Sequence, residues 1–133
     1  MKPSLCATLT ALPLLAGCVV ADPQPIAVRG DGLLTVEWTV HGTADPHECT
    51  SEGADAIDIL VTTPGGASVA EATDDCRAST TIIELPPGSY YADAVLLDSA
   101  GHSITSAADL GGFHIYGDDE LVVQADFPLD SFF

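Results

Sequence analysis

Basic side chains are scarce in this sequence of 133 residues. It contains 3 Lys and Arg residues against 20 Asp and Glu residues, which gives a formal net charge of −17 at pH 7. A surface with this charge repels phosphate backbones and anionic lipid headgroups. The composition therefore excludes nucleic-acid binding and membrane binding through a basic patch. The length fits a single domain, and no constellation of residues in the sequence predicts an enzyme.

Long apolar runs are also missing, apart from one near the start of the chain. After Lys2, residues 5–16 form an apolar run that is too short to span a bilayer and has the length of a secretory signal core. Residues 15–18 then read Leu-Ala-Gly-Cys, which resembles the lipobox of bacterial lipoproteins. In those proteins a signal peptidase cleaves before the Cys once its sulfur carries a diacylglyceryl group. The sequence predicts a cleaved signal at residues 1–17 and a lipidated Cys18; an ordinary cleaved signal is the alternative.

The predicted lipid on Cys18 is sufficient to hold the protein at a membrane. Each buried CH₂ contributes about 0.8 kcal/mol, so one acyl chain binds weakly and two or three bind stably. Val19 follows this Cys, and by resemblance to lipoproteins of double-membrane bacteria, a residue other than Asp here favours the outer membrane. Residues 18–31 are then the lipidated N-terminus and a Pro-containing tether, and residues 32–133 the folded domain. The predicted location is the cell envelope.

Helical patterning is missing as well, since no segment shows a sustained apolar stripe at helical spacing. Apolar and polar residues alternate instead, which is typical of strands with one buried face. The alternation runs through residues 33–41, 55–63, 80–85, 89–98, 113–115 and 121–127. Turn-forming Gly, Pro and Ser residues separate these segments. About seven short strands at this spacing predict an all-β fold, an antiparallel β-sandwich, with Trp38 in its core.

Two cysteines, Cys49 and Cys76, remain for the folded domain. An isolated pair in an exported protein predicts a disulfide. In the chain-entropy description such a bridge would contribute roughly 3–4 kcal/mol to stability. The alternative is a metal site that combines these thiols with His41 and His47, but the spacing around Cys49 is not that of a zinc motif.

Several short motifs together resemble a known kind of domain. They are Val-Glu-Trp at residues 36–38, Leu-Pro-Pro-Gly-Ser-Tyr at 85–90 and Leu-Asp-Ser-Ala-Gly at 97–101. With the two cysteines, this succession is similar to bacterial lipoproteins that carry a transthyretin-like sandwich of the carboxypeptidase-regulatory or collagen-adhesin B type. The resemblance spans residues 33–127 and implies the fold, while such domains serve as stalks, spacers, accessory modules or ligand binders. No internal isopeptide bond is expected, because the sequence has no Lys after residue 2.

Acidic turns and scattered histidines supply the remaining candidate ligands. Carboxylates at residues 74–75 and 118–120 could bind Ca²⁺, since hard cations prefer oxygen ligands. Because EF-hand spacing is missing, we expect at most weak divalent cation binding and no resident metal or cofactor. The histidines lie on separate segments, with His41 and His114 expected on outward faces.

Three further patterns could indicate a ligand, a partner or a reaction. Tyr91 and Tyr116 lie opposite the inferred core rows and could stack sugar rings, but aromatic residues are only 6% of the sequence, too few to predict a platform. Residues 101–105 read Gly-His-Ser-Ile-Thr, which begins like a Gly-x-Ser-x-Gly nucleophile elbow but ends on Thr. Phe132 and Phe133 are expected to cap the core or contact a partner.

The sequence as a whole predicts a non-catalytic structural or interaction module on the cell envelope, with an envelope protein as its partner. The alternative is a ligand-binding module for Ca²⁺ or carbohydrate. A concave site with convergent polar groups would favour the alternative, whereas flat faces and short hairpins would favour the first interpretation.

Overall fold

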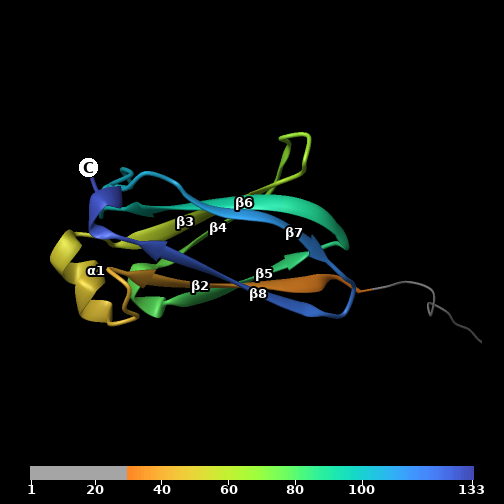
Figure 1. The fold of residues 1–133 in the computed structure, drawn as a ribbon, viewed down its shortest axis with the longest axis horizontal. Helices are drawn as coiled ribbons and strands as arrows, with labels where there is room; N and C mark the ends of the chain where they lie inside the picture. The colour runs from red at the N-terminus through yellow and green to blue at the C-terminus, as the bar shows by residue number, and fades with distance from the viewer. Residues whose placement is uncertain (1–29) are drawn as a thin grey trace, which may run out of the picture.

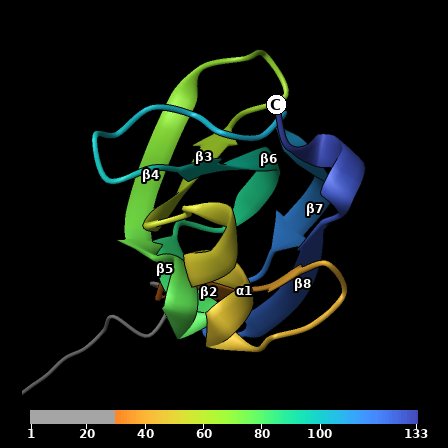
Figure 2. The same cartoon turned by 90° about the vertical axis from the view of Figure 1, so that its left-hand side faces the viewer.

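The computed structural model describes residues 30–133, so the predicted signal at residues 1–17 and Cys18 lie outside the described residues. Two sheets pack face to face in a β-sandwich (Figures 1 and 2). The three-stranded sheet has the order β5 (Thr80–Leu85), β2 (Gly32–Val40), β8 (Glu120–Phe127). The four-stranded sheet has the order β4 (Ser68–Asp75), β3 (Ala56–Thr62), β6 (Gly88–Leu97), β7 (Ala108–Ile115). The predicted β-sandwich of about seven strands is confirmed.

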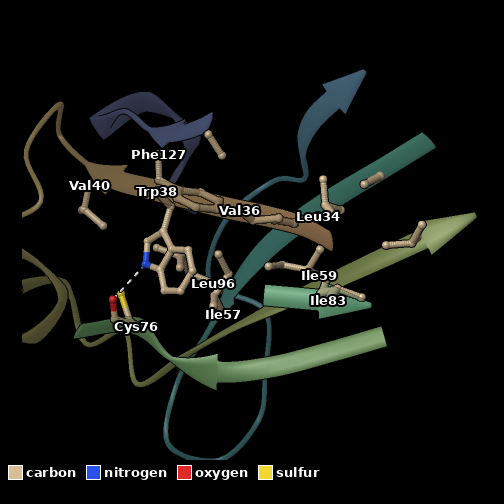
Figure 3. Packing of buried hydrophobic residues seen from close by; sticks show 14 of the residues in the cluster. Leu34, Val36, Trp38, Val40, Ile57, Ile59, Cys76, Ile83, Leu96 and Phe127 are labelled. Atoms are coloured by element: carbon tan, nitrogen blue, oxygen red, sulfur yellow. Dashed lines mark hydrogen bonds between the residues drawn. The ribbon is translucent and has the colours of Figure 1, made fainter. Parts of the chain in front are cut away.

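Alternation along the strands builds the core between the two sheets. Every second residue of β2 is buried, and Trp38 near the C-terminal end of the strand is 2% exposed, in the core as the sequence predicts. Alternate residues of β6, from Tyr90 to Leu96, face it from the other sheet. Figure 3 shows the side chains of β2 and β3 meeting in this layer. Each fully buried aliphatic side chain contributes about 1.5–3 kcal/mol, so these rows hold the sheets together.

One strand pair differs from the wholly antiparallel arrangement that the sequence suggests. β2 and β8 run parallel, with Leu33 aligned to Glu120 and Val40 to Phe127. The remaining pairs in the two described sheets are antiparallel. Parallel neighbours cannot be joined by a tight turn, and here all the elements between β2 and β8 form the connection. Alternation is the same in both kinds of pair, so the pattern alone does not distinguish them.

The sequence analysis does not predict strand β4 or helix α1. β4 is an edge strand whose residues are exposed or half-buried, so its alternation is weak. Helix α1 (Pro46–Glu52) is too short to show a stripe. Its ends are nevertheless well marked: the Asp45 side chain accepts a hydrogen bond from the His47 N–H, and Gly53 closes the helix with φ of 77°. Within residues 30–133, no helix is long and apolar enough to cross a membrane.

The first described residues enter the sandwich at the end opposite α1 and the C-terminus (Figure 1). Backbone hydrogen bonds hold this segment against the turn between β7 and β8, with the Leu33 N–H donating to the Asp119 carbonyl over 2.8 Å. A Cβ on Gly32 would overlap the carbonyl of Tyr116 in the same turn. Figure 2 looks onto the opposite end, with α1 nearest the viewer. The chain therefore emerges from a fixed position at the end of the sandwich away from α1.

Candidate functional site

A disulfide bond links helix α1 to the rest of the sandwich. Cys49 of α1 is bonded to Cys76 at the start of the short helix η1 (Cys76–Ala78), with their Cα atoms 6.0 Å apart. Both cysteines are buried, and the Trp38 Nε1–H donates to the Cys76 carbonyl over 2.8 Å. Figure 3 shows this bond between the indole and η1. The predicted bridge is confirmed, and the alternative of a metal held by these thiols is wrong because the two sulfurs are bonded to each other.

His41 is not the outward-facing surface residue that alternation suggests. It follows the last residue of β2 with φ of 55°, which turns its ring away from the strand pattern. The ring nitrogens lie 2.9 Å from the Glu48 carboxylate and 3.2 Å from that of Glu52, both on α1. The ring also packs edge-on against Phe132, with centroids 5.6 Å apart. His41 thus joins β2, α1 and the C-terminal segment.

The two terminal Phe residues, expected to cap the core or contact a partner, have different environments. Phe132 packs against the core cluster and forms a bridge with Thr105. Phe133 is 87% exposed although its N–H donates to the Ile104 carbonyl. One ring therefore covers the end of the core, and the other lies in solvent.

A groove of about 470 Å³ lies on the outer side of the three-stranded sheet, beside the loop that leads to α1. Its polar side chains are bonded to one another: Gln124 donates to the Glu37 carboxylate over 3.1 Å, and the Thr39 hydroxyl donates to Asp126 over 2.6 Å. None of the residues that line it is His, Cys, Lys or Arg. The groove therefore offers carboxylate and hydroxyl oxygens to solvent.

The carboxylates of the acidic turn at residues 74–75 are engaged in local structure. The Asp75 carboxylate accepts from the Arg77 side chain over 2.8 Å and from its backbone N–H over 2.9 Å, and these bonds lower the pKa of Asp75. Asp74 accepts from the Asp75 N–H over 2.8 Å. In the part of the chain that the structure describes, no three His, Cys, Asp or Glu side chains converge as metal ligands would. Ca²⁺ binding thus has no preformed cluster among these residues.

The segment that resembles a nucleophile elbow is a turn between strands. Thr105 is buried, and its hydroxyl oxygen accepts a hydrogen bond from the Leu96 N–H over 3.1 Å. Ser103 forms an isolated bridge with Leu97. Before them, the Asp98 carboxylate accepts from the backbone N–H groups of His102 and Ala100, and these bonds lower the pKa of Asp98. The polar groups of this segment shape the turn.

The lowered pKa of Asp98 predicts a pH-dependent contribution to stability. A carboxyl group whose pKa is lower in the folded chain stabilises it above the unfolded value of about 4, and the contribution is lost as pH falls through the folded pKa. We expect Asp98→Asn to lower Tm near pH 7 and to change it little near pH 2, because Asn keeps an acceptor oxygen and loses the charge. Thermal unfolding followed by circular dichroism would measure this, with exposed Asp130→Asn as the control. An equal fall in Tm at every pH would contradict the assignment.

The outer face of the four-stranded sheet carries aromatic side chains near the end where the chain emerges. Tyr91 and Tyr116 are 50% and 60% exposed, as expected from the sequence, and His114 is also exposed, as predicted. The His114 and Tyr116 ring centroids are 4.4 Å apart. A hollow of about 310 Å³ lies beside Tyr91 and His114. The sequence does not reveal this grouping, because it depends on the register between β6 and β7.

The comparisons with known proteins find likeness in fold only. No protein-family model matches the chain, and no curated protein matches it in sequence. Among solved structures, the Bacillus anthracis TIE protein is similar with a TM-score of 0.45 and 14% identity, over 87% of this chain and 19% of that one. A Bacteroides thetaiotaomicron protein described as a candidate polysaccharide-binding protein has a TM-score of 0.40 and 10% identity, over 70% and 46%. A pilus-presented adhesin has a TM-score of 0.30 and 14% identity, over 88% and 30%.

These similarities are distant. The chain spans less than half the length of each of the three proteins. At TM-scores below 0.5 the likeness carries no argument about the location, ligand or partner of this chain. What the domain does has to be inferred from its own residues.

Proposed function

We propose that the protein is a lipoprotein of the cell envelope whose folded domain is a non-catalytic structural or interaction module. The lipobox at residues 15–18 supports the anchor, with lipid on Cys18. The Cys49–Cys76 disulfide supports a location outside the cytoplasm, because such bonds persist in oxidising compartments. Val19 favours the outer membrane. The motif resemblance to lipoproteins with a transthyretin-like domain agrees with this proposal.

The position at which the chain joins the sandwich is the observation that carries the proposal. The described chain begins beside the turn between β7 and β8, where Gly30 lies next to Asp118, at the end opposite α1 and the C-terminus (Figure 1). Lipid on Cys18 would hold the domain by that end, through a tether that reaches up to about 40 Å at about 3 Å per residue. The α1 end and the outer faces of both sheets would remain free. This geometry suits display of the domain to a partner in the envelope.

Palmitate labelling of cells that express the full chain tests the anchor. We expect the wild type to take up label and Cys18→Ser to lose it completely, because only the thiol of Cys18 can receive the diacylglyceryl group. Cys6→Ser is the matched control, since this Cys lies inside the predicted signal and is removed with it. It should label as the wild type does. Label retained in Cys18→Ser, or absent from the wild type, would refute the proposal.

A further inference from the structure

The outer face of the four-stranded sheet holds a group of side chains that the proposed function does not use. Tyr91 of β6 lies directly opposite Gly112 of β7, and Ser89 opposite His114. Tyr116 follows β7 and stacks at a tilt against His114. We call Tyr91, His114 and Tyr116 the aromatic strip. It contains both exposed tyrosines of the described residues, while Tyr90 is buried.

Gly112 gives the Tyr91 ring its position. A Cβ built at Gly112 would lie 2.9 Å from Tyr91 Cε1 and 3.4 Å from both Cδ1 and Cζ. The ring therefore lies against the β7 backbone, in space that any other side chain would occupy. Gly112 is not among the glycines with positive φ, so its backbone does not itself require glycine. Half of Tyr91 remains exposed, and the ring is held against the sheet with one side towards solvent.

Two polar side chains, Ser89 and His114, line the same hollow as the Tyr91 ring. The Ser89 hydroxyl lies 3.0 Å from His114 Nδ1, which fixes the imidazole beside Tyr91. The hollow of about 310 Å³ is bounded by Tyr91, His114 and Pro64. A smaller hollow of about 140 Å³ is bounded by His114, Tyr116 and Asp119. His114 borders both hollows, and Tyr91 and Tyr116 border one each.

We infer that the aromatic strip binds a neutral polysaccharide, with one sugar ring stacked on Tyr91 and its neighbours passing His114 towards Tyr116. A pyranose has an apolar face of C–H groups and a rim of hydroxyls. Tyr offers a rigid apolar ring with a polar tip that matches both. His114, Ser89 and Asp119 supply donors and acceptors for the hydroxyls. The larger hollow has the volume of a small ligand site.

The negative charge of this face favours a neutral polysaccharide over an anionic one. Asp93 follows Tyr91 by two residues on β6 and shares its outward face. On neighbouring strands, Asp58 raises the pKa of Glu71 through a hydrogen bond and charge repulsion, which shows how closely carboxylates are placed there. With a net charge of −17, the protein repels uronic-acid or phosphate-bearing polymers. This inference goes beyond the envelope-anchor proposal and does not depend on lipid at Cys18.

Affinity electrophoresis of the detergent-purified full chain tests the inference. Native gels would contain dextran, mannan, xylan or laminarin as neutral probes, or polygalacturonate as the anionic probe. We expect at least one neutral probe to retard the wild type and polygalacturonate to have no effect. Tyr91→Ala should weaken binding about tenfold or more, and Tyr116→Ala about threefold.

Two further variants distinguish a change at the aromatic strip from a general effect of removing or moving an exposed aromatic ring. Gly112→Ala keeps every aromatic ring but displaces Tyr91 from the backbone, so binding should weaken about three- to tenfold. Phe133→Ala removes an exposed ring at the other end of the domain and should bind as the wild type does. Circular dichroism would establish that each variant is folded. The inference is overturned if no neutral probe retards the wild type, if Tyr91→Ala binds normally, or if polygalacturonate binds as well.

Discussion

Replacing Cys49 and Cys76 together by Ser is expected to lower the free energy of unfolding by about 3–4 kcal/mol. The two residues are 27 positions apart, and a bridge over this distance removes roughly that much conformational free energy from the unfolded chain. A domain of this size has a total stability of about 5–15 kcal/mol. The variant should therefore lose a large share of its stability.

The loss of stability should affect the α1 end of the sandwich most. Helix α1 has seven residues, and a helix this short is not stable by itself in water. The bridge joins it to η1, and His41 joins it to the end of β2. Without the bridge, we expect the α1 end to open first while the strand pairs of the two sheets persist.

Urea denaturation followed by the fluorescence of Trp38 would measure the effect, because this is the one Trp in the sequence and it is buried. Reduction of the wild type with dithiothreitol should reproduce the loss of the double-Ser variant. The same reductant should leave that variant unchanged, which serves as the control. A denaturation midpoint that stays constant after reduction would show that the bridge does not stabilise the domain.

Trp38→Ala is expected to lower the free energy of unfolding by about 3–5 kcal/mol, as for other large aromatic side chains removed from cores. The indole is 2% exposed between the sheets, and its N–H donates to the Cys76 carbonyl. Trp38→Phe keeps much of the apolar volume but leaves that carbonyl without this donor. Its cost should be smaller, about 1–3 kcal/mol.

Far-UV circular dichroism during urea denaturation would measure these variants, since they lack the fluorescent probe. Val122→Ala, on the exposed outer side of β8, is the matched control and should change stability little. Trp38→Phe should also be non-additive with the double-Ser variant, because η1 carries both the indole acceptor and one end of the bridge. Additive losses would show that the indole and the disulfide act independently.

The sequence predicts the parts of the fold that follow from local alternation. The buried row of β2 and the core position of Trp38 follow from a period of two. The parallel pairing of β2 with β8 does not, because it is set by packing between segments far apart in the chain. Helix α1 could have been inferred from Asp45, Pro46 and Gly53, which carry a standard capping pattern.

On the candidate binding face, too, the sequence predicts which side chains are exposed but not which residues they contact. Exposure of Tyr91 and Tyr116 follows from their position opposite the core rows. The role of Gly112 does not, because only the β6–β7 register brings it under Tyr91. His41 departs from the alternation of β2 for a different reason: its positive φ turns the side chain towards α1. Sequence patterns thus predict which way a side chain faces more readily than which residue it meets.

We propose that acyl chains on Cys18 hold this domain at the envelope. Intact-mass measurement of the protein extracted from membranes tests it most directly. We expect a chain that begins at Cys18 and carries the added mass of a diacylglyceryl group and, where the amine is also acylated, one further acyl chain. An extracted protein that starts elsewhere, or that starts at Cys18 with an unmodified thiol, would contradict the account.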